Sequence, residues 1–263
     1  MIAEFALAYQ DIPTALHNYT VLAIKSNSTA VKQRALNVAI EQNDLQAALD
    51  IATHWVAQEP EDVPALFYLS HIALKAHEYD SAAETLDKIL NIDPNADLEQ
   101  ILAGISPESA DDRDFLIRAL RASKEGRNPS ILVLIAGLEA QNGQLHEALD
   151  TINQALKKRP KSTGYILMKA NLLTALGNDE ETLKWYNKAS QKHKSNLEVR
   201  LAEVKYLIKI NQSKQALDKL EKILEKWPHE DETLFIAGLT SIDLEEYEKA
   251  ERFLVELRYS AQY

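Results

Sequence analysis

The sequence predicts an all-α protein, an α-solenoid of about eight stacked helical hairpins, on three observations. Ala and Leu dominate the 263 residues, whereas Gly and Pro, which interrupt helices, occur only 7 and 8 times. A small residue recurs at intervals close to 34 residues. Residue types typical of turns keep a fixed distance from it. A hairpin of this length cannot bury its apolar face alone, so neighbouring copies are expected to stack into a continuous core.

The recurring small residue marks the point where the two helices of a hairpin touch. Its positions are Ala15, Ala48, Ala82, Ala148, Thr182, Ala216 and Ala250. The successive steps are 33, 34, 66, 34, 34 and 34 residues, and the step of 66 corresponds to two repeats with an irregular copy between them. Six steps on one grid indicate a true internal repeat.

Two further positions keep the same grid and predict where the helices end. Five residues before the small residue stand Gln10, Asn43, Gly143, Gly177 and Asn211. Apart from Gln10, these are types that tolerate the left-handed conformation at the end of a helix. Twelve residues after it stand Pro60, Pro94, Pro160 and Pro228. Proline cannot continue a helix, so these residues are predicted to end the second helix of each hairpin.

On this grid the whole chain, residues 1–263, is predicted to be one solenoid. The repeats are expected at residues 1–28, 29–62, 63–96, 97–128, 129–162, 163–196, 197–230 and 231–263. In the third repeat, for example, the first helix is predicted over residues 65–77 and the second over residues 79–91. The first helix of each repeat is called helix A below, and the second is called helix B.

Two repeats depart from the pattern. In the fourth, a helix over residues 96–105 is interrupted by Ser106 and Pro107, and a second helix is predicted over residues 111–124. The segment of Phe115 and Leu116 replaces the small contact residue there, which predicts a shifted helix crossing or a docking corner. The first repeat is truncated, because the grid places Met1 inside helix A. The chain is therefore expected to be part of a longer array, and its uncapped terminal repeats are expected to favour self-association.

The composition argues against several classes of function. The net charge of −11 makes nucleic acid an improbable main partner, since such proteins present basic surfaces. The chain has no cysteine, and no stretch reaches the ~20 apolar residues of a membrane span. The seven histidines are scattered over different repeats, and no phosphate-binding glycine loop or nucleophile motif occurs. We therefore expect a protein that is not an enzyme and binds no cofactor or metal.

The repeated residues resemble the tetratricopeptide repeat (TPR), and the resemblance covers nearly the whole chain. It implies a scaffold that holds a protein or peptide partner along the concave face formed by the A helices. Matching the positions of this repeat to the sequence gives a predicted concave set: Asn37, Phe67, His71, Leu74, Val133, Leu167, Asn171, Leu201, Lys205, Phe235 and Leu239. Phe67 and Phe235 are the expected anchors, because aromatic side chains carry much of the binding energy at interfaces. The cations of a carboxylate clamp are missing beside Asn37 and Asn171.

A closer resemblance concerns residues 30–35, with the pattern A-x-x-x-x-A, and residues 48–55, which end in Trp55. These segments, together with the final repeat, look like a group of γ-proteobacterial outer-membrane TPR lipoproteins. The group includes a protein that binds and activates a periplasmic carboxyl-terminal processing protease and presents cell-wall hydrolases to it. The resemblance implies an adaptor that is periplasmic and anchored to the outer membrane in its full-length form. The lipobox cysteine and signal peptide of such proteins are absent from this sequence.

Two other functions fit the same residues. One is a general TPR scaffold in cytosolic or envelope assembly, and the other is the repeat arm of a larger enzyme. The sequence upstream and downstream of these 263 residues distinguishes the three functions. A leader that ends in a lipobox cysteine would favour the lipoprotein adaptor, and a mixed α/β domain after the repeats would favour the enzyme arm.

Overall fold

The computed structural model describes residues 2–96, 98, 107 and 109–258, and the fold within them is entirely helical. The chain divides into two compact units, Met1–Ala155 and Leu156–Tyr263, and each unit is described by itself. The first unit holds α1 (Ile2–Ala8), α2 (Ile12–Lys25), α3 (Thr29–Glu41), α4 (Leu45–Gln58), α5 (Val63–Lys75), α6 (Tyr79–Ile92), α8 (Ala110–Ala122), α9 (Pro129–Gln141) and most of α10 (Leu145–Lys158). The second holds α11 (Thr163–Ala175), α12 (Asp179–Lys192), α13 (Leu197–Lys209), α14 (Ser213–Leu224), α15 (Asp231–Asp243) and α16 (Tyr247–Arg258). The helix–turn–helix units predicted from the sequence are confirmed; a single solenoid over residues 1–263 stays a prediction.

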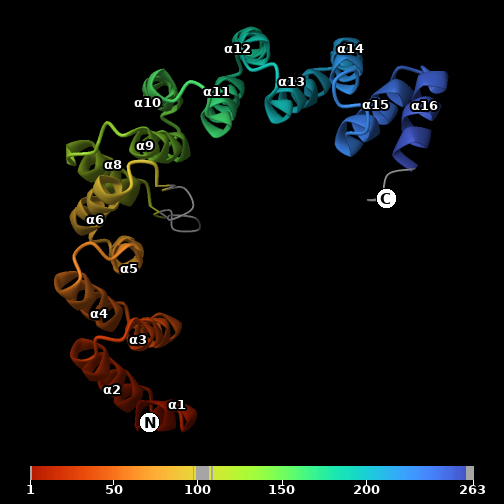
Figure 1. Cartoon of the computed structure of the whole chain (residues 1–263). Coiled ribbons are helices and arrows are strands. Elements are labelled where there is room, and N and C mark those ends of the chain that lie inside the picture. The colour runs from red at the N-terminus through yellow and green to blue at the C-terminus, as the bar shows by residue number, and fades with distance from the viewer. Residues whose placement is uncertain (1, 97, 99–106, 108, 259–263) are drawn as a thin grey trace. The chain divides into compact units, whose positions relative to one another are not determined.

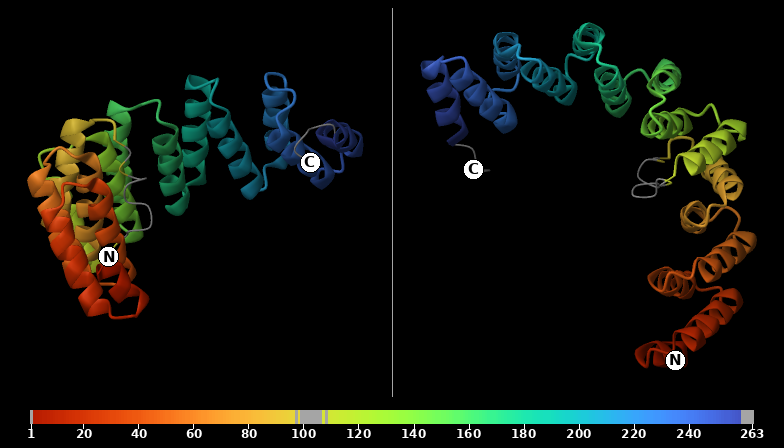
Figure 2. Two further views of the ribbon diagram at one scale, coloured as in Figure 1. Left: turned by 60° about the horizontal axis from the view of Figure 1, so that its bottom comes forward. Right: turned by 180° about the vertical axis from the view of Figure 1, so that it is seen from behind.

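Successive helices pack against one another within each unit. In the first unit, α1 to α6 contact each other in chain order, and α8 packs on both α6 and α9. In the second unit, α11 to α16 do the same (Figure 1). The two helices of a hairpin lie side by side, as the further views show (Figure 2). Each unit is therefore a row of hairpins in which every helix covers part of the next.

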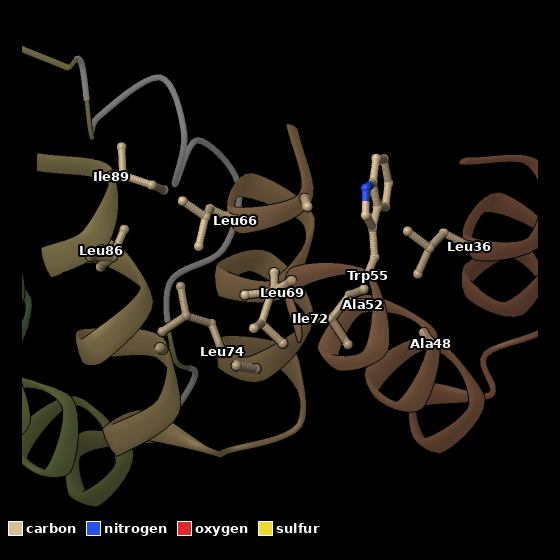
Figure 3. Packing of buried hydrophobic residues seen from close by; sticks show 14 of the residues in the cluster. Leu36, Ala48, Ala52, Trp55, Leu66, Leu69, Ile72, Leu74, Leu86 and Ile89 are labelled. Atoms are coloured by element: carbon tan, nitrogen blue, oxygen red, sulfur yellow. The ribbon is translucent and has the colours of Figure 1, made fainter. Parts of the chain in front are cut away.

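The seven small residues of the grid all lie at the hairpin contact. Ala15, Ala48, Ala82, Ala148, Thr182, Ala216 and Ala250 are all buried. Around them, larger side chains from successive helices fill the core. Figure 3 shows this in the first unit, where Leu36, Trp55, Leu69 and Leu86 come from α3, α4, α5 and α6. A small residue at the contact lets two backbones approach closely, and the larger residues then close the space beside it.

The turn inside each hairpin follows one design. Positive φ angles occur at Gln10, Asn43, His77, Gly143, Gly177, Asn211 and Glu245, which are the seven positions five residues before the grid residue. The amide after each of them donates back to a carbonyl five residues earlier, as from Asp44 to Ala39 at 2.9 Å and from Glu78 to Ala73 at 2.8 Å. This is the Schellman motif, in which a left-handed residue ends one helix and the next residue begins another. The prediction that turn residues keep the grid is confirmed.

The fourth repeat is only partly described. The predicted helix over residues 96–105 lies outside the described residues except at residues 96 and 98. The predicted second helix is present as α8, in which Leu116 is buried and Phe115 is exposed. The turn after α8 is held by Asp87 of α6, whose carboxylate accepts hydrogen bonds from the amides of Lys124 at 2.7 Å and Glu125 at 3.2 Å. Asp87 thereby ties the irregular repeat to the third one.

Candidate functional site

All eleven predicted concave-face residues lie on A helices, but they differ in how far they reach the surface. Asn37 (α3), Asn171 (α11), Lys205 (α13), Phe235 and Leu239 (α15) are exposed. Phe67, His71 (both α5) and Leu167 (α11) are half-buried. Leu74 (α5), Val133 (α9) and Leu201 (α13) are buried.

The buried three correct the expectation that the whole set lines an open surface. Leu74 and Leu201 belong to the hydrophobic cores of the first and second unit. Val133 is equally enclosed. In each repeat, helix A is covered on one side by helix B of the same repeat and on another by the neighbouring hairpin. A large part of its circumference is therefore buried. A partner could reach these three side chains only by displacing core residues.

Two of the exposed predicted residues, Phe235 and Leu239, belong to an apolar stripe on α15. Phe235 is 45% exposed, Leu239 is 44% exposed and Ile242 is similarly open. Their spacing of four and three residues puts them on one face of the helix. We call this set, Phe235, Leu239 and Ile242, the α15 stripe. Ile242 is not among the predicted residues, although its spacing of three residues from Leu239 is the signal that indicates it.

The opposite side of α15 is committed to packing against α16. Leu234, Ala237 and Ser241 are buried. Gly238 lies so close to α16 that a Cβ atom there would be 2.6 Å from Leu254 Cδ2. Because α15 is fixed by this close contact, the α15 stripe is held outward on a rigid element. Rigid apolar side chains lose little conformational entropy when a partner covers them.

An ion pair flanks the α15 stripe at its N-terminal end. Lys205 Nζ on α13 lies 2.6 Å from Glu232 Oε1 on α15, and Glu232 is one turn before Phe235. Both side chains are exposed, so the pair adds little to stability. It joins the A helices of two successive repeats and leaves a polar edge beside the apolar residues. An apolar centre with a polar rim is the usual anatomy of a protein interface.

The other predicted anchor, Phe67, lies in an aromatic cluster on the first unit. Its ring is 5.9 Å from that of Tyr68 in an edge-to-face arrangement and 6.2 Å from that of His71. Tyr68 in turn stacks on Trp55 of α4 at 6.1 Å. Burial and the neighbouring Lys75 charge lower the pKa of the His71 imidazole. Phe67 therefore contributes mainly to packing on α5, whereas Phe235 is available to a partner.

Metal sites and membrane spans are both absent from the described residues. Nowhere in residues 2–96, 98, 107 and 109–258 do three His, Asp or Glu side chains gather closely enough to hold a metal ion. Within the same ranges, none of the helices combines the length and the apolar character needed to cross a bilayer.

Comparison with known proteins gives the following similarities. Residues 39–105 match the family model of the tetratricopeptide repeat. The TPR repeat-containing protein PA4667 of Pseudomonas aeruginosa is 24% identical over 204 residues, which cover 77% of this chain and 34% of that protein. The chain thus spans about a third of the length of that relative.

Solved structures with detectable similarity come from several proteins. A double mutant of MamA from RS-1 has 13% identity and a TM-score of 0.46, over 69% of this chain and 93% of that one. YrrB, described as a TPR protein with an unusual peptide-binding site, has 16% identity and a TM-score of 0.41, over 78% and 90%. A tetratricopeptide repeat protein from Parabacteroides merdae has 14% identity and a TM-score of 0.43, over 99% and 91%.

The family match covers the second and third hairpins, where the grid residues Ala48 and Ala82 are both fully buried. The same grid places the left-handed turn residue of every other described hairpin. The 34-residue period and the helical hairpins of the other repeats agree with the match to the tetratricopeptide repeat over residues 39–105.

Proposed function

We propose that this chain is a non-catalytic adaptor that tethers a periplasmic carboxyl-terminal processing protease and its cell-wall hydrolase substrates. Proteins built from this repeat generally act as interaction scaffolds. The observation that carries a binding role for this chain is the α15 stripe. Three large apolar side chains stand exposed on one rigid helix, next to the Lys205–Glu232 pair. Exposed apolar patches with a polar rim are typical of interaction sites.

The geometry of the α15 stripe favours an apolar segment of a protein as the ligand. Phe235, Leu239 and Ile242 form a row about two turns long, in line with the helix axis. A row of this kind can dock against one face of a partner helix or against alternate side chains of an extended segment. The aromatic ring of Phe235 offers the largest contact area and is the expected centre of the interface.

The protease as partner is supported by sequence similarity. Residues 30–35 and 48–55 resemble a group of outer-membrane lipoproteins that includes a protein known to bind such a protease. In this proposal the full-length protein is periplasmic and anchored to the outer membrane. It speeds cleavage by holding protease and substrate together, which raises their effective concentration without chemistry of its own.

The direct test measures binding of the purified chain to the purified carboxyl-terminal processing protease of the same organism, by biolayer interferometry. We expect binding, and we expect Leu239→Asp to weaken it by about tenfold or more, because a charge would be buried at the interface. Leu22→Asp is the matched control. Leu22 lies on the B helix α2 and is 47% exposed, close to the 44% of Leu239. Leu22→Asp should change the affinity for the protease by less than about twofold.

A second measurement separates binding from adaptor function. Cleavage of a purified cell-wall hydrolase by the protease should accelerate when the chain is added and should return to the basal rate with Leu239→Asp. Failure of the protease to bind the unaltered chain would remove the adaptor proposal. Equal loss with Leu22→Asp and Leu239→Asp would instead remove the α15 stripe as the docking surface.

A further inference from the structure

The charges of the chain are divided unevenly between its two units. Residues 1–155 contain 10 Lys and Arg against 23 Asp and Glu, whereas residues 156–263 contain 19 against 17. The first unit therefore carries a net charge of −13, and the second unit is slightly basic with a net charge of +2. Clusters of one sign within such a unit are candidate interaction surfaces, since charge complementarity guides association.

Many of these cations gather around one groove of the second unit. The groove has a volume of about 580 Å³ and lies between α12, α13 and α14. We call it the α12–α14 groove. Its charged lining residues are Lys194, Arg200, Glu203, Lys219, Lys222, Glu225 and Lys226. Two of the three helices that form the α12–α14 groove, α12 and α14, are B helices. None of the residues of the α15 stripe lines this groove.

The floor of the α12–α14 groove is electrically neutral. The side chain of Glu203 is only 2% exposed, and its Oε1 lies 2.8 Å from Lys219 Nζ. Its other oxygen accepts a hydrogen bond from Ser190 Oγ at 2.8 Å. A buried carboxylate with a lysine partner is compensated and holds that lysine in place. Lys219 and Glu203 therefore form the base of the groove and add no net charge to it.

The rim of the α12–α14 groove keeps its positive charge. Lys226 donates to the carbonyl of Lys194 and to Ser195 Oγ, both of which are neutral acceptors. The guanidinium of Arg200 lies over the Trp227 ring at 5.7 Å, which orients it and leaves its donors available.

The side chains of Lys194 and Lys222 have no acidic partner among the described residues. Together with Arg200 and Lys226 they give four cations, against the single uncompensated carboxylate of Glu225. A groove with this excess of positive charge is suited to bind carboxylates.

The positive region ends at the next groove along the second unit. That groove has a volume of about 480 Å³ and lies between α14 and α16. Its lining includes Glu225, Glu256 and Glu221, which is paired with Lys249 at 2.9 Å, and its cation is Arg252. A long polyanion such as nucleic acid would run from the basic groove into this acidic one and be repelled there. The boundary favours a short acidic segment, which can lie within the α12–α14 groove alone.

We propose that the α12–α14 groove binds a short, carboxylate-rich peptide segment of a partner protein. The acidic side chains of this segment would pair with the rim cations. Its backbone amides and carbonyls would hydrogen-bond with Gln191, an exposed lining residue of α12 that has both a donor and an acceptor. This second surface is independent of the α15 stripe and of the identity of the partner that docks there.

The test uses the whole chain and two fluorescein-labelled peptides, followed by fluorescence anisotropy. In the first peptide Glu alternates with Ser, and in the second Gln replaces every Glu. We expect the Glu peptide to bind at least about tenfold more tightly than the Gln peptide, and we expect its affinity to fall as salt is added. Similar affinity for both peptides would overturn the proposal.

Charge-reversal variants locate the site. Lys194→Glu with Lys222→Glu should weaken binding of the Glu peptide by about tenfold or more. Lys188→Glu with Lys209→Glu makes the same change in net charge on α12 and α13 outside the groove, and should change the affinity by less than about threefold.

Equal loss in both double variants would show a diffuse charge effect and would overturn the proposal. Tighter binding of a short duplex RNA than of the Glu peptide would overturn it in favour of a general polyanion surface. Salt-dependent self-association of the unaltered chain would assign the groove to a second copy and would also overturn it.

Discussion

The ammonium group of Lys32, on α3, lies 2.8 Å from Glu59 Oε1 at the C-terminal end of α4. The Lys32 side chain is only 1% exposed, while Glu59 reaches solvent. The ammonium group also lies over the ring of Trp55, 5.5 Å from its centroid. A buried lysine is stable only when its charge is compensated, so Glu59 determines whether Lys32 can remain inside the hairpin.

We therefore predict opposite results for the two partners. Glu59→Ala leaves an uncompensated buried charge and should lower the Tm clearly. Lys32→Met removes the charge and keeps the volume, so it should change the Tm little or raise it. Thermal unfolding followed by circular dichroism measures both. A Tm that falls as far with Lys32→Met as with Glu59→Ala would contradict this account.

The pair of Lys32 and Glu59 also predicts how the stability of the protein depends on pH in the acid range. The hydrogen bond from Lys32 lowers the pKa of the Glu59 carboxyl below its usual value of 4.5. A depressed folded-state pKa stabilises the protein above the unfolded-state value, and this stabilisation is lost as the pH falls toward the folded-state value. Below about pH 4.5, the Tm of the unaltered chain should therefore fall more steeply than that of Lys32→Met.

Gly126 follows α8 in a turn that has no room for a side chain. A Cβ atom there would lie 2.6 Å from the carbonyl oxygen of Leu120 and 2.9 Å from that of Arg121. Backbone atoms cannot move aside without breaking the turn held by Asp87. We expect Gly126→Ala to lower the free energy of unfolding by more than about 1 kcal/mol. Chemical denaturation measures it.

Gly164 provides the matched control for this substitution. It lies in the first turn of α11, and a Cβ atom there would meet nothing within 4 Å. Gly164→Ala should stabilise the protein by about 0.5 to 1 kcal/mol, because alanine restricts the unfolded chain more than glycine does. If both alanine variants changed stability in the same direction, the close contact at Gly126 would not be the cause.

The left-handed turn residues allow a test of the repeat design itself. Glu245 has a φ of 60° where glycine would avoid steric strain, and Gly177 occupies the equivalent turn with a φ of 72°. Glu245→Gly should raise the free energy of unfolding by about 1 kcal/mol, and Gly177→Ala should lower it by about the same amount. The denaturation midpoints of the two variants measure both changes. If both midpoints moved in the same direction, the prediction would be contradicted.

These turns also show how much of the fold the sequence contains. The 34-residue period locates the turn even at His77 and Glu245, where the residue type gives no hint, because the position is determined by the repeat and not by local propensity. The helix boundaries follow from the same grid. In the third repeat, helix A begins and ends two residues before its predicted bounds, and helix B ends one residue after its predicted end.

The candidate surfaces were harder to predict. The A helices carry apolar residues around most of their circumference, so helical periodicity alone does not separate Leu74 or Val133, which are buried, from Leu239, which is exposed. Whether a residue of helix A is buried depends on how the next hairpin packs against that helix. The α12–α14 groove has a related difficulty, since Lys194 and Lys222 lie on separate segments and only the packing of three helices brings them to one rim.

His71 provides a final prediction, on stability near neutral pH. Burial on α5 and the charge of Lys75 lower the pKa of its imidazole below the usual value of 6.5. The unfolded chain therefore binds a proton at a pH where the folded chain does not, so stability falls as the pH drops through about 6.5 toward the folded-state pKa. We expect the Tm of the unaltered chain to fall between pH 7.5 and 5.5 by more than that of His71→Gln.

The control for this prediction is His17→Gln. His17 is exposed on α2, three helices before α5 in the chain. This variant should keep the full pH dependence of the unaltered chain, whereas His71→Gln should lose part of it. If the two variants lost the same part, the pH dependence would come from the general change in charge, and burial of His71 beside Phe67 would not contribute to it.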